Sequence, residues 1–447
     1  MSSPVTPSAE CPRTSAQQRF HWLPAPTKWI EDYRPGRYHP VNFGDTFKNP
    51  RYRVIRKLGY RSYSTVWLAR DQDFNRYVAL KIPIADPDLS KKEPSILHAL
   101  SQTTSEHPGK LHILTPADTF EHKGPNGAHR CFVFEIMGPS LATALEEPSE
   151  ELEKLCDTSV RYHERYPIWM VESILYQTLL GIDFLHQKGT GHGDLSQSNL
   201  LFPVKDFTSV EERQLTRDDK VSDPVRRKDG LTDRWAPKYL ALSQPLDEYI
   251  DVPPGFNIKI SDFEEVPFFL AYPPAKLVNP VALRSPELMF TNVINKDQDI
   301  WCFGSLIFEL FAGRTLFVVP DMGNRESVDD DHFLQFHDIL GPIPYSLWSK
   351  YPRAHIYYND KGELVKHYIG ELSSGSDSDS IEPLAPLATA FDEEKPKDLS
   401  VEDAENVKRL LAWILDYNPG KRPSAEELLQ DPWFVGIAAA LGKSREI

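Results

Sequence analysis

The sequence predicts an α+β protein with two lobes, a small β-rich lobe followed by a larger and mainly helical one. Residues 51–84 are rich in β-branched and aromatic side chains, with turn signals at Gly59 and at 71–75, which predicts a run of strands. From Ile168 onward, apolar residues recur at the spacing of an amphipathic helix. The order of these patterns predicts that the β-rich lobe comes first.

The chain is long enough for each lobe to bury a core, since it has 447 residues, of which 40% are hydrophobic. Two polar segments interrupt this order, and a spacer insert is predicted inside the helical lobe. The expected organisation is a disordered tail at 1–30, a small lobe at 31–137, a large lobe at 138–437 containing an insert at about 204–256 and an acidic Ser-rich loop at about 371–382, and a C-terminal tail at 438–447.

Charge and composition restrict the classes of partner. Fifty basic and 65 acidic residues give a formal net charge of −15, which disfavours direct binding to nucleic acid and suits a basic partner. The first 20 residues lack the apolar core of a signal peptide, and no run of 18 apolar residues predicts a membrane segment. The four cysteines form no CxxC pair. A soluble protein of a reducing compartment is expected.

The stretch "GHGDLSQSNL" at residues 191–200 places an Asp and an Asn five residues apart after a buried helix. Asp194 in such a loop could accept a hydroxyl proton while Asn199 binds a metal ion beside a nucleotide's phosphates. A further acid, Asp262 in "IKISDFEE", follows a strand-like run and could coordinate Mg²⁺. For any one of these residues alone, a capping or loop role would explain it equally well.

Lys81 lies in the predicted strand "VALKI", where an unpaired ammonium group would be costly to bury. Glu93, on the helical segment that follows, could pair with it. A lysine held by a glutamate can be directed at the α- and β-phosphates of a nucleotide. The alternative is a surface lysine on an edge strand.

Taken in order, the motifs of this chain resemble those of eukaryotic protein kinases, and of the SR-protein kinase family in particular. The resemblance runs from about Tyr33 to Phe434, with an interruption at the insert. It is carried by the entry "YRPGRYHPVNFGDTF…RYRVIRKLG…STVWLARD", followed by "VALK", "HGDLSQSN", "SDFE", "LRSPE", "DIWCFG" and "NPGKRPSAEELLQDPWF". It implies the bilobal protein kinase fold, with ATP and Mg²⁺ as cofactors.

The resemblance also implies a role for each matching position. Lys81 and Glu93 would form the phosphate-anchoring ion pair, Asp194 would be the catalytic base, and Asn199 and Asp262 would bind magnesium. The nucleotide would also contact a set of small-lobe residues: Leu58, Gly59, Val66, the gatekeeper Phe134, and the hinge from Glu135 to Met137. Structural roles fall to a buried pair, Glu287 with Arg422, and to Asp299, which would hold the backbone of the catalytic loop.

Four positions depart from the family pattern. Arg61 and Ser64 stand where a glycine-rich loop would let the backbone approach the phosphates. Ser196 replaces a lysine of the catalytic loop, and Glu264 replaces the glycine after Asp-Phe. These changes remove positive charge or add negative charge near a polyanion, so phosphoryl transfer is expected to be slowed.

Gly193 stands where most kinases carry an arginine that binds an activating phosphate. The segment from Phe263 to Arg284 contains no Ser or Thr, and its only hydroxylated side chain is Tyr272. The two absences agree with an enzyme that is active without phosphorylation of this segment, as the resemblance to SR-protein kinases also implies.

Two other functions remain open on these residues. A catalytically weak or inactive pseudokinase acting as a binding module would explain Arg61, Ser196 and Glu264. A small-molecule phosphotransferase would share "HGDL" and the later "DFE", but "LRSPE" and "DIWCFG" belong to the protein kinase pattern. The preferred interpretation is a monomeric serine/threonine protein kinase of the cytoplasm or nucleus, with Arg/Ser-rich protein substrates.

Overall fold

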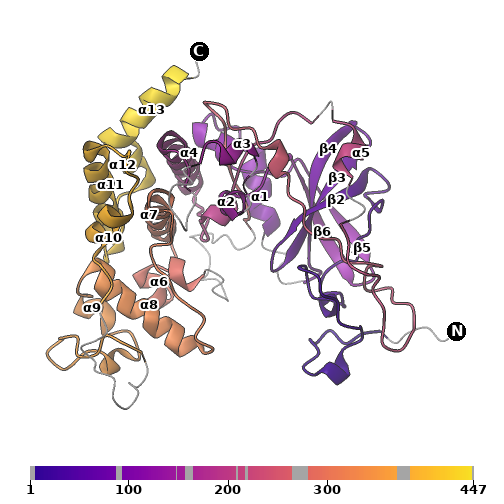
Figure 1. Ribbon diagram of the computed structural model, residues 1–447, viewed down its shortest axis with the longest axis horizontal. Helices are drawn as coiled ribbons and strands as arrows, with labels where there is room; N and C mark the ends of the chain where they lie inside the picture. Colours follow the sequence, from indigo (N-terminus) through magenta and orange to yellow (C-terminus); the bar gives the residue numbers. More distant parts are fainter. Residues whose placement is uncertain are drawn as a thin grey trace. The chain divides into compact units, whose positions relative to one another are not determined.

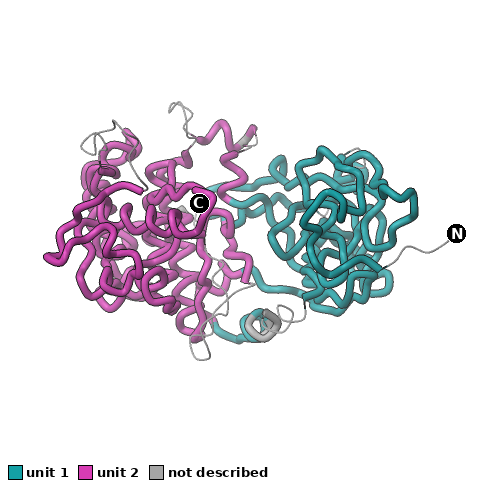
Figure 2. The backbone as a smooth tube through the Cα atoms, turned by 90° about the horizontal axis from the view of Figure 1, so that it is seen from below, with its two compact units in different colours: residues 1–105, 114–140, 201–256 teal, residues 106–113, 141–200, 257–447 magenta. Residues whose placement is uncertain are grey.

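The computed structural model describes residues 6–86, 93–146, 148, 150–156, 165–207, 210–216, 220–263, 280–369 and 383–444. The chain forms two compact units, shown in teal and magenta in Figure 2. Unit 1 comprises Met1–Ser105, Leu114–Ser140 and Leu201–Phe256, and unit 2 comprises Glu106–Ile113, Leu141–Leu200 and Asn257–Ile447. One unit is built on a sheet and the other on helices, so the predicted two-lobed α+β fold is confirmed (Figure 1).

Unit 1 is built on a six-stranded antiparallel sheet with the strand order β1-β2-β3-β4-β6-β5. Its strands are β1 (Thr46–Phe47), β2 (Tyr52–Tyr60), β3 (Ser64–Asp71), β4 (Arg76–Pro83), β5 (Asp118–Gly124) and β6 (Gly127–Phe134). The helical elements of this unit are η1 (Ser15–Gln17), η2 (Ile30–Asp32), α1 (Glu93–Gln102), α5 (Glu212–Leu215) and η5 (Asp247–Tyr249).

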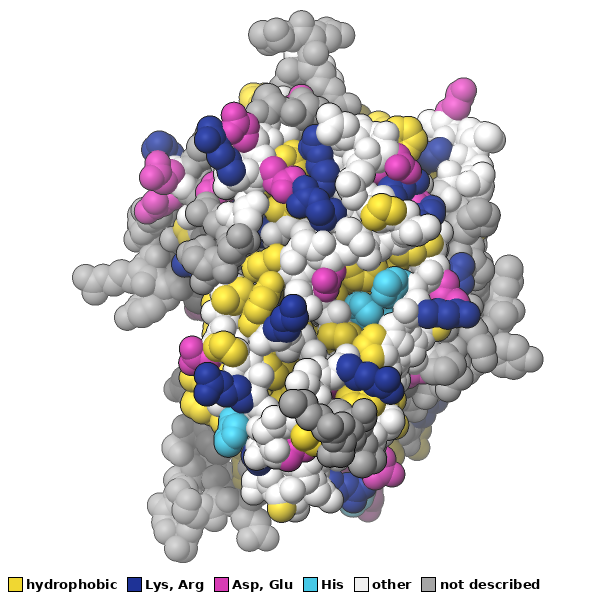
Figure 3. Space-filling model, turned by 90° about the vertical axis from the view of Figure 1, so that its right-hand side faces the viewer, with side chains coloured by type: hydrophobic (Ala, Val, Ile, Leu, Met, Phe, Trp, Pro, Cys, Tyr) yellow, Lys and Arg dark blue, Asp and Glu magenta, His cyan; other side chains and the backbone are white. Residues whose placement is uncertain are grey.

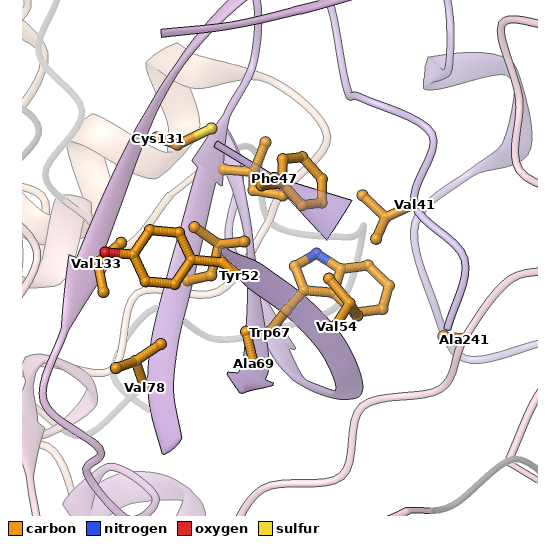
Figure 4. Packing of buried hydrophobic residues seen from close by; sticks show 12 residues of the cluster. Val41, Phe47, Tyr52, Val54, Trp67, Ala69, Val78, Cys131, Val133 and Ala241 are labelled. Atoms are coloured by element: carbon orange, nitrogen blue, oxygen red, sulfur yellow. The ribbon is translucent and has the colours of Figure 1, made fainter. Parts of the chain in front are cut away.

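The two faces of this sheet carry different side chains because strand residues alternate between faces. Trp67 pairs with Leu80, which pairs in turn with Val133, and these three belong to a buried cluster on one face. Figure 4 shows that Val41, which precedes β1, and Ala241, which lies far along the chain, complete this cluster. The opposite face carries the neighbouring residues of the same strands, among them Lys81.

The segment 204–256 differs from the insert that its polar composition predicted, because it packs on the sheet of unit 1. Phe207, Leu215 and Leu246 are at most 6% exposed and form one cluster with Ile55 and Leu68 of the strands. Trp235 is 2% exposed, and its carbonyl accepts a hydrogen bond from the Asn126 side chain at 2.8 Å. A few large apolar residues are enough to fix a segment whose other side chains are polar.

The N-terminal segment also differs from the expected disordered tail. Phe20 is 2% exposed and forms an isolated antiparallel bridge with Arg227 of the segment 204–256. Arg19 pairs with Glu31 at 3.1 Å and with Asp233 at 3.3 Å, and Arg227 reaches the same Asp233 carboxylate at 2.7 Å. The described part of the tail, from residue 6 on, is therefore bound to the segment 204–256 by a shared network of ion pairs.

Unit 2 is mainly helical. Its α-helices are α2 (Leu141–Glu146), α3 (Glu150–Glu153), α4 (Ile168–Gln187), α6 (Pro286–Thr291), α7 (Lys296–Ala312), α8 (Arg325–Leu340), α9 (Tyr345–Trp348), α10 (Leu387–Glu394), α11 (Val401–Ile414), α12 (Ala425–Leu429) and α13 (Pro432–Ser444). Shorter elements are η3 (Pro108–His112), η4 (Gln197–Asn199), β8 (Lys259–Ile260), η6 (Val281–Leu283), η7 (Ala354–Ile356) and η9 (Pro419–Lys421). Strand β7 (Leu200–Leu201), which pairs with β8, stands at the boundary between the two units in the sequence.

Helices α4 and α7 form the centre of unit 2, and nearly every residue of α7 is buried. Among the described helices, only α4 is long and apolar enough to cross a membrane, but 78% of that stretch is buried inside the protein, as expected of a core helix. The predicted C-terminal tail at 438–447 is helical as far as Ser444, because α13 continues through it. The Ser-rich loop at 371–382 lies outside the described residues. The four cysteines, all described, form no disulfide bonds.

Candidate active site

The loop that follows α4 is held by a buried acid at the start of α7. The backbone N–H groups of His192 and Gly193 donate to the two carboxylate oxygens of Asp299 at 2.8 and 2.6 Å. His186, at the end of α4, lies 3.0 Å from the same carboxylate through Nε2. The sequence prediction that Asp299 holds the backbone of this loop is confirmed.

Asp299 is ionised although it is only 1% exposed. Burial alone would raise the pKa of this carboxyl, but the hydrogen bonds from His186 and Gly193 and the nearby imidazole rings together lower it. A buried carboxylate with several donors can stay charged because each donor replaces a lost water contact. The fixed charge of Asp299 therefore determines where the loop backbone lies.

Asp194 and Asn199 lie close together within this loop. The Asn199 amide nitrogen donates to the Asp194 carbonyl oxygen at 2.8 Å and lies 3.3 Å from the Asp194 carboxylate. The short helix η4 ends at Asn199, and it produces the turn that makes this approach possible. Asn199 is 4% exposed, whereas Asp194 is partly exposed, as a group that meets a substrate must be.

Asp262 is tied to the same loop through its neighbours in the chain. The N–H of Ser261 donates to the Asn199 carbonyl at 2.8 Å, and the Ser261 carbonyl lies 2.9 Å from His192 Nε2. Phe263, on the other side, packs edge-on against the His192 ring at 5.1 Å. Unit 2 thus brings together Asp194, Asn199 and the chain around Asp262, which the sequence placed 63 residues after Asn199.

Two residues of this region have left-handed backbone conformations. Asp262 has a φ of 71°, which is uncommon for a residue other than glycine and is one of the backbone conformations that also occur at functional sites. Gly193 has a φ of 79°, where glycine is favoured. Gly193 therefore has a backbone reason for being glycine that the sequence analysis did not include. Glu264 and Tyr272 lie outside the described residues.

Three of the residues expected to contact nucleotide in unit 1, together with Phe132, form a row across the sheet. Gly59 is paired with Val66, Val66 with Lys81, and Lys81 with Phe132 in the cross-strand register, so all four lie on one face. Phe134, two residues beyond Phe132, shares this face. Lys81 is 7% exposed, so the alternative of a surface lysine does not hold.

Other positions of the predicted nucleotide set are placed less fully. Leu58 lies at an irregularity in the pairing of β2 with β3 and is partly buried against the cluster that contains Phe207. Glu135 is exposed and Met137 is 9% exposed, in the segment that follows β6. Glu93 begins α1, but its side chain lies outside the described residues. The pairing of Glu93 with Lys81 stays a prediction.

The loop that replaces a glycine-rich loop is supported by a residue that sequence reasoning missed. The Tyr38 hydroxyl donates toward the carbonyls of Arg61 and Ser62, at 3.2 and 2.5 Å, while its ring is 1% exposed. The Arg61 N–H also donates to the Ser64 carbonyl at 2.9 Å. Tyr38 is 23 residues away from Arg61, so no local pattern could have indicated this support.

The predicted buried pair of unit 2 is confirmed. The two guanidinium nitrogens of Arg422 bind the two carboxylate oxygens of Glu287 at 2.7 and 2.8 Å. The same guanidinium lies 4.8 Å from the centre of the Trp301 ring. A bidentate pair of this kind fixes direction as well as distance. It joins the start of α6 to the loop before α12.

Comparisons with known proteins agree with this geometry. The protein kinase domain family matches residues 52–222 and 249–434. A serine/threonine protein kinase of Aspergillus fumigatus is 30% identical over 95% of both chains. The serine/threonine-protein kinase SRPK of Physarum polycephalum is 28% identical over 91% of both chains, and protein kinase dsk1 of Schizosaccharomyces pombe is 27% identical over 91% of this chain and 85% of its own.

Solved structures show the same fold. The crystal structure of a kinase domain superimposes with a TM-score of 0.59, at 21% identity, over 89% of this chain and 98% of the other. Since the family match covers most of the chain and includes both units, the chain belongs to the protein kinase family, as an ATP-dependent serine/threonine kinase with relatives among the SR-protein kinases.

Proposed function

We propose that this kinase transfers the γ-phosphoryl group of Mg-ATP to serine hydroxyls in Arg/Ser-rich proteins, with Asp194 as the base. The observation that carries the proposal is the arrangement of one loop, in which Asp299 fixes the backbone and Asn199 bonds to Asp194. Such a loop presents a carboxylate and an amide in a constant geometry, which phosphoryl transfer requires because its catalysis is mainly positioning.

In the proposed step, the Asp194 carboxylate accepts the proton of the substrate hydroxyl as its oxygen forms a bond to the γ-phosphorus. The bond from that phosphorus to the β-γ bridging oxygen breaks, and ADP leaves with the electron pair. Lys81 contributes a positive charge for the α- and β-phosphates. The partly exposed Asp194 carboxylate suits this role, since a general base must reach the hydroxyl.

The residues that would hold magnesium are Asn199 and Asp262. Both supply oxygen donors, which Mg²⁺ prefers. Because the Asn199 amide nitrogen is directed at Asp194, the coordinating role falls to the amide oxygen. Bound magnesium would neutralise charge on the phosphate oxygens. The left-handed backbone at Asp262 also suits a side chain held for a ligand.

The proposed substrate class follows from charge and from relatives. The chain has a formal net charge of −15, so a basic peptide is attracted to it. One relative carries the name SRPK, and another is named SRSF protein kinase 3, from Homo sapiens. Phosphate transfer to an Arg-Ser repeat peptide should therefore exceed transfer to a matched Lys-Ser peptide of equal charge. Equal rates on the two peptides would leave only a preference for basic substrates.

Two substitutions test the site assignments. Asp194→Ala should retain the melting shift caused by Mg-ATP and lower transfer by roughly 10² to 10⁴, the usual effect of losing a positioned base. Asp262→Ala should remove the magnesium dependence of that shift. When Mg-ATP is present at about 100 times its dissociation constant, the wild-type protein should gain about 2.7 kcal/mol of apparent stability.

Ser196→Lys addresses the loss of charge in the loop, and it should raise turnover with little change in nucleotide affinity. Asp297→Asn is the matched control, because Asp297 is an acid of α7 that faces Asn295 and not the loop. If wild type shows no magnesium-dependent melting shift and no transfer to the Arg-Ser peptide, the proposed catalytic roles are wrong.

A further inference from the structure

The catalytic loop has a second attachment to α7, three turns after Asp299. The Gln197 side-chain amide donates to the Glu309 carboxylate, with 3.2 Å between Nε2 and Oε2. Gln197 begins η4, the short helix that ends at Asn199. The two halves of the loop are thus held by two acids of one helix, Asp299 for the residues before Asp194 and Glu309 for those after it.

The two acids differ in the number of their partners. Asp299 has three donors, whereas Gln197 is the only hydrogen-bond donor to the Glu309 side chain among the described residues, and no described cation pairs with it. Glu309 is 8% exposed. Burial raises the pKa of its carboxyl to about 7, and the hydrogen bond from Gln197 lowers it by less.

Titratable groups of both kinds, acids and imidazoles, lie in the part of α7 that contains Asp299 and Cys302. Cys302 lies two turns earlier on α7, and its buried thiol has a raised pKa, first through burial and then through the charges of Asp299, Asp194 and Glu309. Two imidazole rings, those of His186 and His192, lie beside Asp299 in the same region. Of the two acids that hold the loop, Asp299 stays ionised while Glu309 changes its charge near neutral pH.

We propose that Glu309 is a positioning residue for phosphoryl transfer, which holds Gln197, and through it η4, more tightly when it is ionised than when it is protonated. This inference rests on the proposed roles of Asp194 and Asn199. An ionised acceptor makes a hydrogen bond roughly twice as strong as a neutral one. Protonation therefore weakens the attachment without removing it, and the loop samples positions that are less suitable for transfer.

The test is a pH profile of kcat for the full chain with saturating Mg-ATP and an Arg-Ser peptide. Wild type should lose activity as pH falls through about 7. Glu309→Gln fixes the neutral form of the acceptor, so its kcat should stay at the low plateau at every pH, roughly 3- to 10-fold below wild type at pH 8. Gln197→Ala should give a similarly flat and low profile.

The matched control is Gln187→Ala. Gln187 makes the same kind of contact, from an amide to the Asp183 carboxylate at 2.9 Å, but at the end of α4 and outside the loop. Its profile should keep the shape of the wild-type curve. Titration of the nucleotide phosphates affects all variants equally. It therefore cancels when the kcat of each variant is divided by the wild-type kcat at the same pH.

Several results would overturn the inference. A limb near pH 7 that persists unchanged in both Glu309→Gln and Gln197→Ala would exclude Glu309 as its source. A rise in the KM for peptide with unchanged kcat would show that Glu309 contacts the substrate instead. Lower melting temperatures with wild-type kcat would show a structural role only. Failure of the proposed base is distinguishable, because Asp194→Ala would then retain full transfer whatever Glu309 does.

Discussion

The catalytic loop and the segment 204–256 are both polar in sequence, yet the structure holds them in opposite ways. The loop is fixed by hydrogen bonds to Asp299 and Glu309, two acids of one buried helix. The segment 204–256 is fixed by a few large apolar residues, such as Phe207 and Leu246, that enter a cluster of unit 1. Average polarity therefore says little about order. What matters is the number of side chains that are fully buried or fully bonded.

The largest effect should come from breaking the polar attachment. Asp299→Asn keeps the shape of the side chain but removes the charge, and its NH2 group replaces one carboxylate oxygen, so a donor faces one of the two backbone N–H groups. Leaving a buried network of this kind unsatisfied typically costs about 3–5 kcal/mol. The free energy of unfolding of unit 2 should fall by that order in urea titrations, and transfer should fall with it. A variant with wild-type stability would show that the loop does not depend on this charge.

The apolar attachment should be nearly as sensitive. Trp235→Ala removes a side chain that is 2% exposed, and such substitutions cost about 3 kcal/mol or more. The loss should appear in unit 1, as a lower melting temperature and faster proteolysis after residue 204. Lys238→Ala, at an exposed position in the same segment, is the control and should change stability by less than about 0.5 kcal/mol. Equal stability of Trp235→Ala and Lys238→Ala would show that the segment is not part of the folded core.

A smaller loss of stability is expected in the N-terminal segment, which is held both by ion pairs and by a buried ring. Arg19→Ala removes the ion pairs with Glu31 and Asp233 but leaves Phe20 in its cluster. Because Asp233 keeps its pair with Arg227, the loss should be about 1–2 kcal/mol. Phe20→Ala should cost more, about 3 kcal/mol. The reverse order, measured by thermal unfolding, would mean that the charges bind the N-terminal segment more strongly than the buried ring.

The smallest effect at neutral pH concerns three histidines of unit 1. The ring of His39, from the segment before β1, has its centre 4.6 Å from the centre of the His122 ring and 5.0 Å from that of the His129 ring. His122 and His129 are cross-strand partners in β5 and β6. Figure 3 shows that histidine side chains (cyan) are bordered by hydrophobic ones on the face that lies to the right in Figure 1. Burial lowers the pKa of His39 to about 2 and that of His129 to about 4, and it also lowers the pKa of His122, opposed by Asp45.

Because these pKa values are lower in the folded state, the unfolded chain binds protons first as pH falls. Stability from the cluster is therefore present above about pH 6.5 and is lost progressively as pH falls, down to about pH 4 for His129 and about pH 2 for His39. His39→Phe should reduce this loss, as measured by melting temperature between pH 7.5 and 5. If wild type and the variant lose stability in parallel, the cluster does not control the acid sensitivity of unit 1.

The sequence predicted the catalytic loop well because its chemistry is local. Asp194 and Asn199 are five residues apart, and the family motifs located Asp299, Glu287 and Arg422 through their own local patterns. The structure confirms the contacts of those three residues. Each of these residues belongs to a short motif with a fixed spacing, so one sequence is enough to locate it.

The sequence did not predict the order of 204–256 or of the N-terminal segment. Their buried residues, such as Phe20 and Trp235, are widely spaced among polar ones and follow neither a period of two nor one of 3.6. Gln197 and Glu309 are 112 residues apart, and Tyr38 and Arg61 are 23 apart. A glutamine or a tyrosine has no sequence signal for a distant partner, so only the folded chain shows these contacts.

The discontinuity of unit 1 has a consequence for biosynthesis. Its last segment ends at Phe256, more than a hundred residues after Ser140, and residues of unit 2 are made in between. A ribosome adds roughly 5–20 residues per second, so synthesis of the residues between Ser140 and Phe256 takes roughly 6–25 seconds. Until it is complete, the segment that packs on Ile55 and Leu68 is not fully available to the strands. During that interval the nascent sheet exposes an apolar face. The yield of folded protein should therefore depend on chaperones that bind the growing chain.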